Sequence, residues 1–238
     1  MSDRLHSDNQ HPQLTLPLTG VPDFDFEAFD PVGNEQLLHR LQQAALGESA
    51  WLFLCGAAGA GKSHLLQAVC LAAQQSGRHC LFLSGRELQA LHADVLQELV
   101  EVDLLCIDDV DRLLGQPAWE EQLFHLYNRL REQGGNLLVA TAAPPRQLTI
   151  GLEDLRSRFA AMELYAIRPL DDDDKRRVLQ RAAQSRGFAL ADDVAGYILQ
   201  RSSRDLVSLQ KVLHRLDQQS LREQRLITLP FVKKVMGW

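Results

Sequence analysis

Residues 56–63 of the chain, GAAGAGKS, fit the spacing G-x-x-x-x-G-K-[ST], and no other feature of the sequence constrains the fold as strongly. The motif follows an apolar run over 51–55 and precedes a helical period that starts at Lys62. Glycines let backbone N–H groups approach phosphate oxygens, and the first turn of a helix supplies partial positive charge. We therefore expect a strand–loop–helix unit that holds the phosphates of a nucleotide, rather than a glycine-rich turn without a ligand.

The side chains at the end of this loop have defined tasks in such a unit. Lys62 would reach the β- and γ-phosphates, and Ser63 would bind Mg²⁺. The residues that we expect to contact nucleotide are consecutive in the sequence: Gly56, Ala57, Ala58, Gly59, Ala60, Gly61, Lys62, Ser63 and His64.

Two carboxylates follow the apolar run over 104–107. A carboxylate at the carboxyl end of a strand beside a phosphate loop can hold Mg²⁺ through its water shell, and Asp108 has this position. Asp109 stands where many ATPases have a Glu that orients the attacking water. Because its side chain is one methylene shorter, we expect Asp109 to be a weaker catalytic base. The alternative is that both carboxylates cap a helix.

Apolar runs and helical periods alternate in the first two thirds of the chain. This alternation predicts an α/β fold, in which a parallel sheet carries helices on both faces. The expected strands are 51–55, 80–84, 104–107 and 136–141, and the expected helices are 34–45, 62–75 and 119–132, with weaker helical stretches over 87–99.

After Pro169 the sequence shows helical periods only. The expected helices cover 171–186, 191–201 and 205–221, with a short one after Pro230. We therefore expect a flexible arm over 1–22, a nucleotide-binding α/β domain over 23–168 and a helical lid domain over 169–238. The four aspartates at 171–174 favour a helix start over a metal site, because acidic groups in a first turn are stabilised by the helix dipole.

Charge and cysteine content exclude several classes of protein. With 25 Lys and Arg against 31 Asp and Glu, the net charge is −6, which argues against binding of bare nucleic acid through a basic surface. No apolar stretch approaches the roughly 20 residues of a membrane helix, so we expect a soluble, cytoplasmic protein. The cysteines show no C-x-x-C pair, which favours reduced thiols in apolar surroundings over a metal site: Cys55, Cys70, Cys80 and Cys106.

The chain resembles the AAA+ family, and within it the replication-initiator branch typified by DnaA, in five segments that occur in the family's order: GAAGAGKSH, LLCIDDVDRL, TAAPPRQL, LEDLRSRF and SRDLVSLQKVL. The resemblance runs from about residue 24 to the end of the chain. It implies that Arg158 is an arginine finger, offered to the γ-phosphate on a neighbouring subunit. It also implies that Arg204 is the sensor-2 arginine of the lid and Thr141 the sensor-1 residue. Ala142 and Ala143 replace the polar residue that often follows this threonine, so we expect only weak intrinsic ATPase activity.

DnaA-type initiators continue into a DNA-binding domain, which we do not expect here because the chain stops soon after the lid. At 13–18 the sequence QLTLPL resembles the peptide by which bacterial replication factors bind the sliding clamp, in the form found in DnaA-related regulators. An extended segment of this kind can insert leucines into an apolar pocket while its glutamine hydrogen-bonds at the edge. The alternative is an arm that packs on its own domain. The expected clamp-binding residues are Gln13, Leu14, Leu16, Pro17 and Leu18.

Together these resemblances imply a negative regulator of replication initiation. Tethered to the sliding clamp, the β subunit of the DNA polymerase, it would stimulate ATP hydrolysis by DnaA through Arg158. The implied cofactors are ADP or ATP and Mg²⁺, and the implied partners are DnaA, the clamp and a second copy of the chain. DNA would be reached only through the clamp, which would bring the protein to the nucleoid, and no membrane partner is expected. The alternatives are a helicase-loader-type ATPase on single-stranded DNA and a P-loop kinase for a small molecule.

Overall fold

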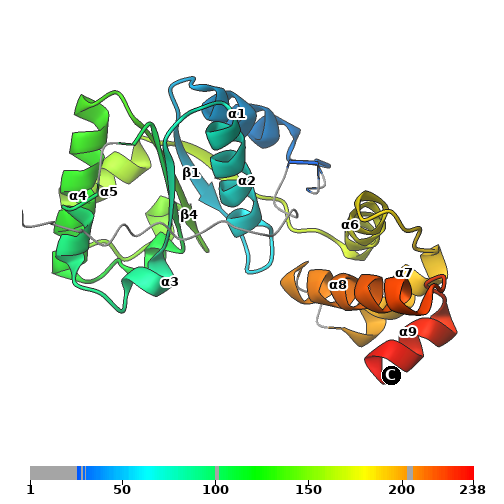
Figure 1. The fold of residues 1–238 in the computed structure, drawn as a ribbon. Helices are drawn as coiled ribbons and strands as arrows, with labels where there is room; N and C mark the ends of the chain where they lie inside the picture. The colour runs from blue at the N-terminus through cyan, green and yellow to red at the C-terminus, as the bar shows by residue number, and fades with distance from the viewer. Residues whose placement is uncertain (1–25, 28, 30, 100–101, 203–205) are drawn as a thin grey trace, which may run out of the picture.

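The computed structural model describes residues 26–27, 29, 31–99, 102–202 and 206–238 (Figure 1). A five-stranded sheet with the strand order β2-β3-β4-β1-β5 forms the first part of the molecule, and all neighbouring strands are parallel. This confirms the predicted parallel α/β fold. The strands are β1 (Trp51–Cys55), β2 (Cys80–Ser84), β3 (Leu104–Asp108), β4 (Asn136–Thr141) and β5 (Glu163–Ala166).

Alternate side chains of the strands point into two separate hydrophobic cores. Leu52 and Leu54 of β1 face the core formed with α1 (Glu35–Leu46) and α2 (Lys62–Gln75). Phe53 faces the other core. Helices therefore cover both faces of the sheet, with α1 and α2 on one side and α4 and α5 on the other (Figure 1). The elements of the second face are α3 (Gly85–Leu88), η1 (Ala93–Leu96), η2 (Val110–Arg112), α4 (Pro117–Glu132), η3 (Pro145–Gln147) and α5 (Glu153–Ala160).

The sequence did not predict α5 or the edge strand β5. Three of the four residues of β5 are exposed, so the strand lacks the continuous apolar pattern of a buried strand. The weaker helical stretches expected over 87–99 form two short elements, α3 and the 3₁₀ helix η1. The N–H groups of Ala90 and Leu91 donate to carbonyls three residues earlier, which ends α3 in a tight turn.

The helical part that follows consists of α6 (Asp172–Ser185), α7 (Asp192–Arg201), α8 (Leu206–Glu223) and α9 (Leu229–Met236). These helices pack around a third hydrophobic core, which includes Leu179, Ile198, Leu213 and Phe231. The chain reaches them through a linker that leaves β5, and Figure 1 shows the two parts side by side. Because the cores are separate, we propose that the domain boundary lies near Pro169. Among the described residues, no helix is both long and apolar enough to span a bilayer.

The acidic run at 171–174 begins α6, as the sequence predicted. Asp171 is the N-cap, and its carboxylate accepts a hydrogen bond of 2.8 Å from the N–H of Asp174. In turn, the carboxylate of Asp174 accepts a hydrogen bond of 3.1 Å from the N–H of Asp171. This reciprocal capping box satisfies two N–H groups that a helix start would otherwise leave unpaired.

Candidate nucleotide-binding site

The loop between β1 and α2 has the backbone that phosphate binding requires. Gly59 and Gly61 have φ angles of 78° and 96°, a region that residues with a side chain rarely adopt. A Cβ atom on Gly61 would also lie 2.6 Å from Cε2 of Phe29. The crest of the loop, Ala57 to Gly59, is exposed to solvent, whereas Ala60 is buried. The sequence therefore places glycine where the chain must turn sharply into the first turn of α2.

Lys62 is buried at the base of this loop. Its ammonium donates hydrogen bonds to the carbonyls of Gly56, at 2.8 Å, and Ala57, at 3.1 Å. Two residues further along α2, the ring of His64 lies beside the ring of Phe29, with the centroids 6.1 Å apart. The positive charge is thus held inside the turn that would surround a phosphate.

Ser63 and Asp108 come together at the carboxyl end of β3, where the hydroxyl of Ser63 donates a hydrogen bond to the carboxylate of Asp108. Asp108 is only 6% exposed. Burial raises the pKa of this carboxyl group, and the charge of Asp109 adds to the effect, while the hydrogen bond from Ser63 opposes it. A hydroxyl and a carboxylate are the hard oxygen ligands that Mg²⁺ prefers. The structure therefore brings together the two residues that the sequence assigned to Mg²⁺.

Asp109 has a left-handed backbone, with φ of 48°. Its N–H donates to the carboxylate of Asp108 at 3.0 Å, and its own carboxylate lies 3.6 Å from Nε of Arg112. Gly85 allows this conformation, because a Cβ atom there would lie 2.2 Å from the carbonyl oxygen of Asp109. The expected weak base is therefore held beside a guanidinium, which competes with a water molecule for its carboxylate.

Thr141 is fully buried at the end of β4. Its hydroxyl donates a hydrogen bond of 2.6 Å to the carbonyl of Ala143, two residues later. A hydroxyl has one proton to donate, so in this arrangement Thr141 has none left for a phosphate oxygen. A sensor-1 role would require this hydroxyl to rotate.

Arg158 lies in the last turn of α5, and its guanidinium carbon is 5.7 Å from the centre of the ring of Tyr127, on α4. The Tyr127 ring is buried and packs against Trp51 at 4.5 Å. Both α4 and α5 cover the face of the sheet opposite α2 (Figure 1). The candidate arginine finger is therefore separated by the sheet from the helix that begins at Lys62.

Glu120 fixes the start of the helix that carries Arg158. Its carboxylate is 2% exposed and accepts three backbone hydrogen bonds, from Gly115 at 2.7 Å, Gly151 at 3.1 Å and Leu152 at 2.7 Å. The sequence patterns did not single out Glu120 or Tyr127. One signal was available, because Glu120 occupies a position of α4 where the helical period of Leu123, Tyr127 and Leu130 calls for an apolar side chain.

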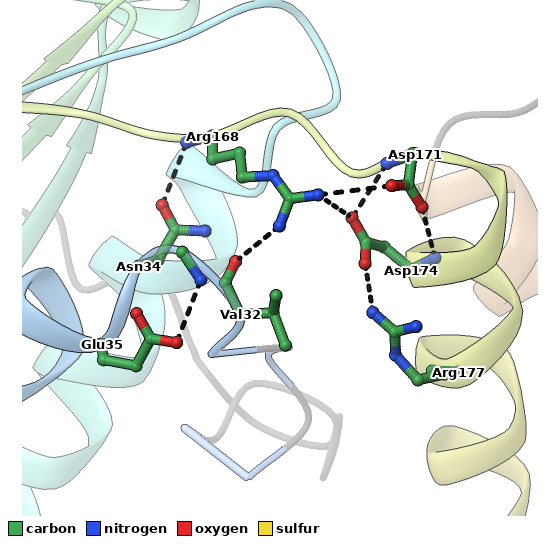
Figure 2. Close-up of polar contacts among 8 residues, drawn as sticks. Val32, Asn34, Glu35, Arg168, Asp171, Asp174 and Arg177 are labelled. Atoms are coloured by element: carbon green, nitrogen blue, oxygen red, sulfur yellow. Dashed lines mark hydrogen bonds and ion pairs between the residues drawn. The ribbon is translucent and has the colours of Figure 1, made fainter.

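Arg168 connects the α/β part to the lid (Figure 2). Its backbone N–H donates to Asn34 at 3.0 Å, and its guanidinium contacts the carbonyl of Val32 at 3.4 Å. The same guanidinium binds Asp171 at 3.3 Å and Asp174 at 3.1 Å, both at the start of α6. No sequence pattern points to this role, because it depends on segments more than 130 positions apart.

Some of the expected site residues lie outside the described residues. The sensor-2 candidate Arg204 is one, so the structure gives no position for it. The whole expected clamp-binding segment, 13–18, also lies outside them.

Comparison with known proteins identifies two matching families. Residues 22–164 match the bacterial DnaA ATPase domain, and residues 172–236 match the lid domain of Hda.

Among solved structures, the chain is similar to domain III of the replication initiation protein DnaA from Thermotoga maritima, with a TM-score of 0.74 and 22% identity over 91% of this chain and 97% of that one. It is also similar to AMPPCP-bound DnaA from Aquifex aeolicus, with a TM-score of 0.68 and 23% identity over 86% of this chain and 70% of that one. The RuvB Holliday junction branch migration motor of Thermotoga maritima matches with a TM-score of 0.60 and 24% identity over 86% and 69% of the two chains. At these identities the likeness establishes a shared fold.

Proposed function

Because the chain belongs to the bacterial DnaA ATPase family and carries an Hda-type lid, we propose that it is a DnaA-related AAA+ protein that negatively regulates replication initiation. In this proposal it binds ADP or ATP with Mg²⁺, docks on ATP-bound DnaA and stimulates hydrolysis of the nucleotide that DnaA holds. The resulting ADP-bound initiator would not fire again.

The residues of the phosphate loop fit an adenine nucleotide with Mg²⁺. Gly59 and Gly61 give the turn the left-handed backbone of a phosphate loop, and the ammonium of Lys62 lies within the same turn. Ser63 and Asp108 would hold Mg²⁺, which when bound neutralises charge on the phosphate oxygens. The lid would close over the nucleotide, with Arg204 directed at its phosphates.

Slow hydrolysis by the chain itself is part of the proposal. The carboxylate of Asp109 faces the guanidinium of Arg112, and the hydroxyl of Thr141 donates to Ala143. In-line attack by water depends on accurate placement of a base, so these arrangements slow catalysis in the protein's own site. The nucleotide would then serve mainly to hold the core and the lid in one arrangement.

The position of Arg158 carries the proposal that this protein acts on a partner. Its guanidinium lies over Tyr127, on the face of the sheet opposite α2. An arginine in this place suits the phosphate of a neighbouring subunit better than that of its own. An arginine finger supplied in trans can raise a hydrolysis rate by about 10³- to 10⁵-fold.

Residues 13–18 would tether the protein to the sliding clamp. Gln13, Leu14, Leu16, Pro17 and Leu18 would bind as an extended peptide, and the clamp would bring the protein to newly replicated DNA. Tethering raises the local concentration of the regulator near DnaA without any new contact between the two proteins.

The test is a hydrolysis assay with cognate DnaA, DNA-loaded clamp and this protein. We expect stimulation by the wild type and loss of most of it in a variant with Gln13→Ala and Leu16→Ala, with recovery at high protein concentration because only the tether is removed. Without DnaA, we expect low ATP turnover that single-stranded DNA does not increase. Strong turnover stimulated by single-stranded DNA, with no effect on DnaA, would instead identify a helicase loader.

A further inference from the structure

Three of the four cysteines meet in the core between α2 and the sheet. The Sγ atoms of Cys70, Cys80 and Cys106 all lie within 4.8 Å of one another. Cys70 comes from α2, Cys80 from β2 and Cys106 from β3. Because each cysteine comes from a different element, no spacing of ligands along the sequence predicts the cluster.

The parallel pairing of β2 with β3 explains why the thiols face one another. Cys80 is paired with Leu104, and Cys106 with Phe82. Residues two apart on a strand share a face, so the two cysteines point to the same side of the sheet, one diagonal step apart. Cys70 faces them from α2, which covers this side of the sheet.

The cluster has one end in the core and the other near solvent. Cys70 and Cys106 are fully buried, whereas Cys80 is partly exposed on β2, one of the two edge strands of the sheet. An ion could therefore reach Cys80 first and then displace the protons of the two inner thiols.

We propose that Cys70, Cys80 and Cys106 form a binding site for one soft, thiophilic metal ion, with Cu(I) as the ion that the three sulfurs suit best. Sulfur ligands select soft ions, and within this cluster the described residues supply sulfur alone. Zn²⁺ in structural sites takes four ligands, and the cluster offers three. An ion about 2.3 Å from each sulfur would hold the sulfurs roughly 4 Å apart, so shifts of about half an ångström close the site.

The three thiols would lose their protons as the ion binds, because the thiolate is the form of cysteine that binds metal.

The site would connect the two elements that carry the proposed Mg²⁺ ligands. Cys70 lies two turns along α2 from Ser63, and Cys106 lies two residues before Asp108 on β3. A bound ion would cross-link these elements to β2 and stabilise the folded state, because it binds the folded chain and has no preformed site in the unfolded one.

Titration of the reduced full-length protein with Cu(I), in competition with a chromophoric Cu(I) chelator and without oxygen, tests the proposal. We expect one Cu(I) per chain and an increase in Tm. Cys70→Ala, Cys80→Ala and Cys106→Ala should each weaken binding by on the order of 100-fold or more, beyond the 10- to 100-fold that loss of an outer-shell partner costs. Cys55→Ala is the matched control, since Cys55 is also buried but lies outside the cluster, and it should bind as the wild type does.

X-ray absorption at the copper edge keeps the test independent of whether the variants fold. In the loaded wild type it should report sulfur ligands only. The absence of Cu(I) binding, binding that survives all three cluster variants, or tight Zn²⁺ binding with rejection of Cu(I) would each overturn the proposal. In the first two cases the cysteines would be thiols that pack as small hydrophobic residues, and in the third they would bind Zn²⁺ instead of Cu(I). None of these outcomes bears on the proposed action on DnaA.

Discussion

The hydroxyl of Ser63, at the start of α2, donates a hydrogen bond to the carboxylate of Asp108, at the end of β3. The two residues are 45 positions apart in the sequence, and their contact joins the phosphate loop to an inner strand of the sheet. A carboxylate kept largely from water without a metal is destabilising, and its pKa is raised for that reason. The pair is thus better suited to holding a cation than to stabilising the fold.

Asp108→Asn should therefore stabilise the metal-free protein while weakening Mg²⁺-dependent nucleotide binding. Because the folded-state pKa of Asp108 is raised, the cost of its charge is absent below the pKa of the unfolded chain, grows as pH rises, and is complete above the folded pKa. The variant should thus show a higher Tm at neutral pH, with the gain vanishing in acid. Thermal unfolding across this pH range, with nucleotide titrations with and without Mg²⁺, checks both effects. A lower Tm at neutral pH with unchanged Mg²⁺ dependence would contradict them.

Glu120→Gln should destabilise the protein and misplace Arg158. The carboxylate accepts three backbone hydrogen bonds, and an amide presents an NH₂ group to at least one of those donors. One buried N–H left unpaired costs about 1–3 kcal/mol. Denaturant unfolding measures this loss, and the exposed neighbour Glu121→Gln serves as the control. Equal stability of the two variants would show that Glu120 does not organise the start of α5.

Tyr127→Leu should reduce the stimulation of DnaA by about 2- to 30-fold, which is the range expected for loss of a cation–π contact. Tyr127→Phe keeps the aromatic face beneath Arg158 and should retain most of the activity. Comparison of the two variants in the DnaA hydrolysis assay, at temperatures where both are folded, separates positioning of the arginine from general stability. Equal stimulation of DnaA by Tyr127→Leu and Tyr127→Phe would show that the aromatic ring does not position Arg158.

Arg168→Ala should loosen the start of the lid. The side chain of Asp174 is 3% exposed and would keep Arg177 as its remaining cationic partner. Faster amide hydrogen exchange is expected at both ends of the lost contacts, over residues 32–35 and 171–175. The exposed lid residue Arg222→Ala is the control. Unchanged protection at both ends would exclude Arg168 as the connection between the parts.

Local geometry could be predicted from residues that are close together in the chain. The loop from Gly56 to Ser63 carries its own geometry in its glycines, and Asp108 is marked by the end of an apolar run. The exposed strand β5 and the cysteine cluster could not be found in this way. The first has no buried face to produce a pattern, and the second depends on the register of β2 against β3 and on the rotation of α2.

Single-turnover hydrolysis of ATP loaded only on DnaA, with clamp on DNA and this protein in its ADP-bound form, tests the central claim most directly. Wild type, Arg158→Lys, Arg158→Ala and the control Arg222→Ala are compared. We expect the wild type and the control to stimulate hydrolysis, and Arg158→Ala to lower the stimulated rate by about 10³-fold or more. Arg158→Lys should retain little of the stimulation, because lysine lacks the planar, forked guanidinium of arginine. Undiminished stimulation by Arg158→Ala would contradict the account.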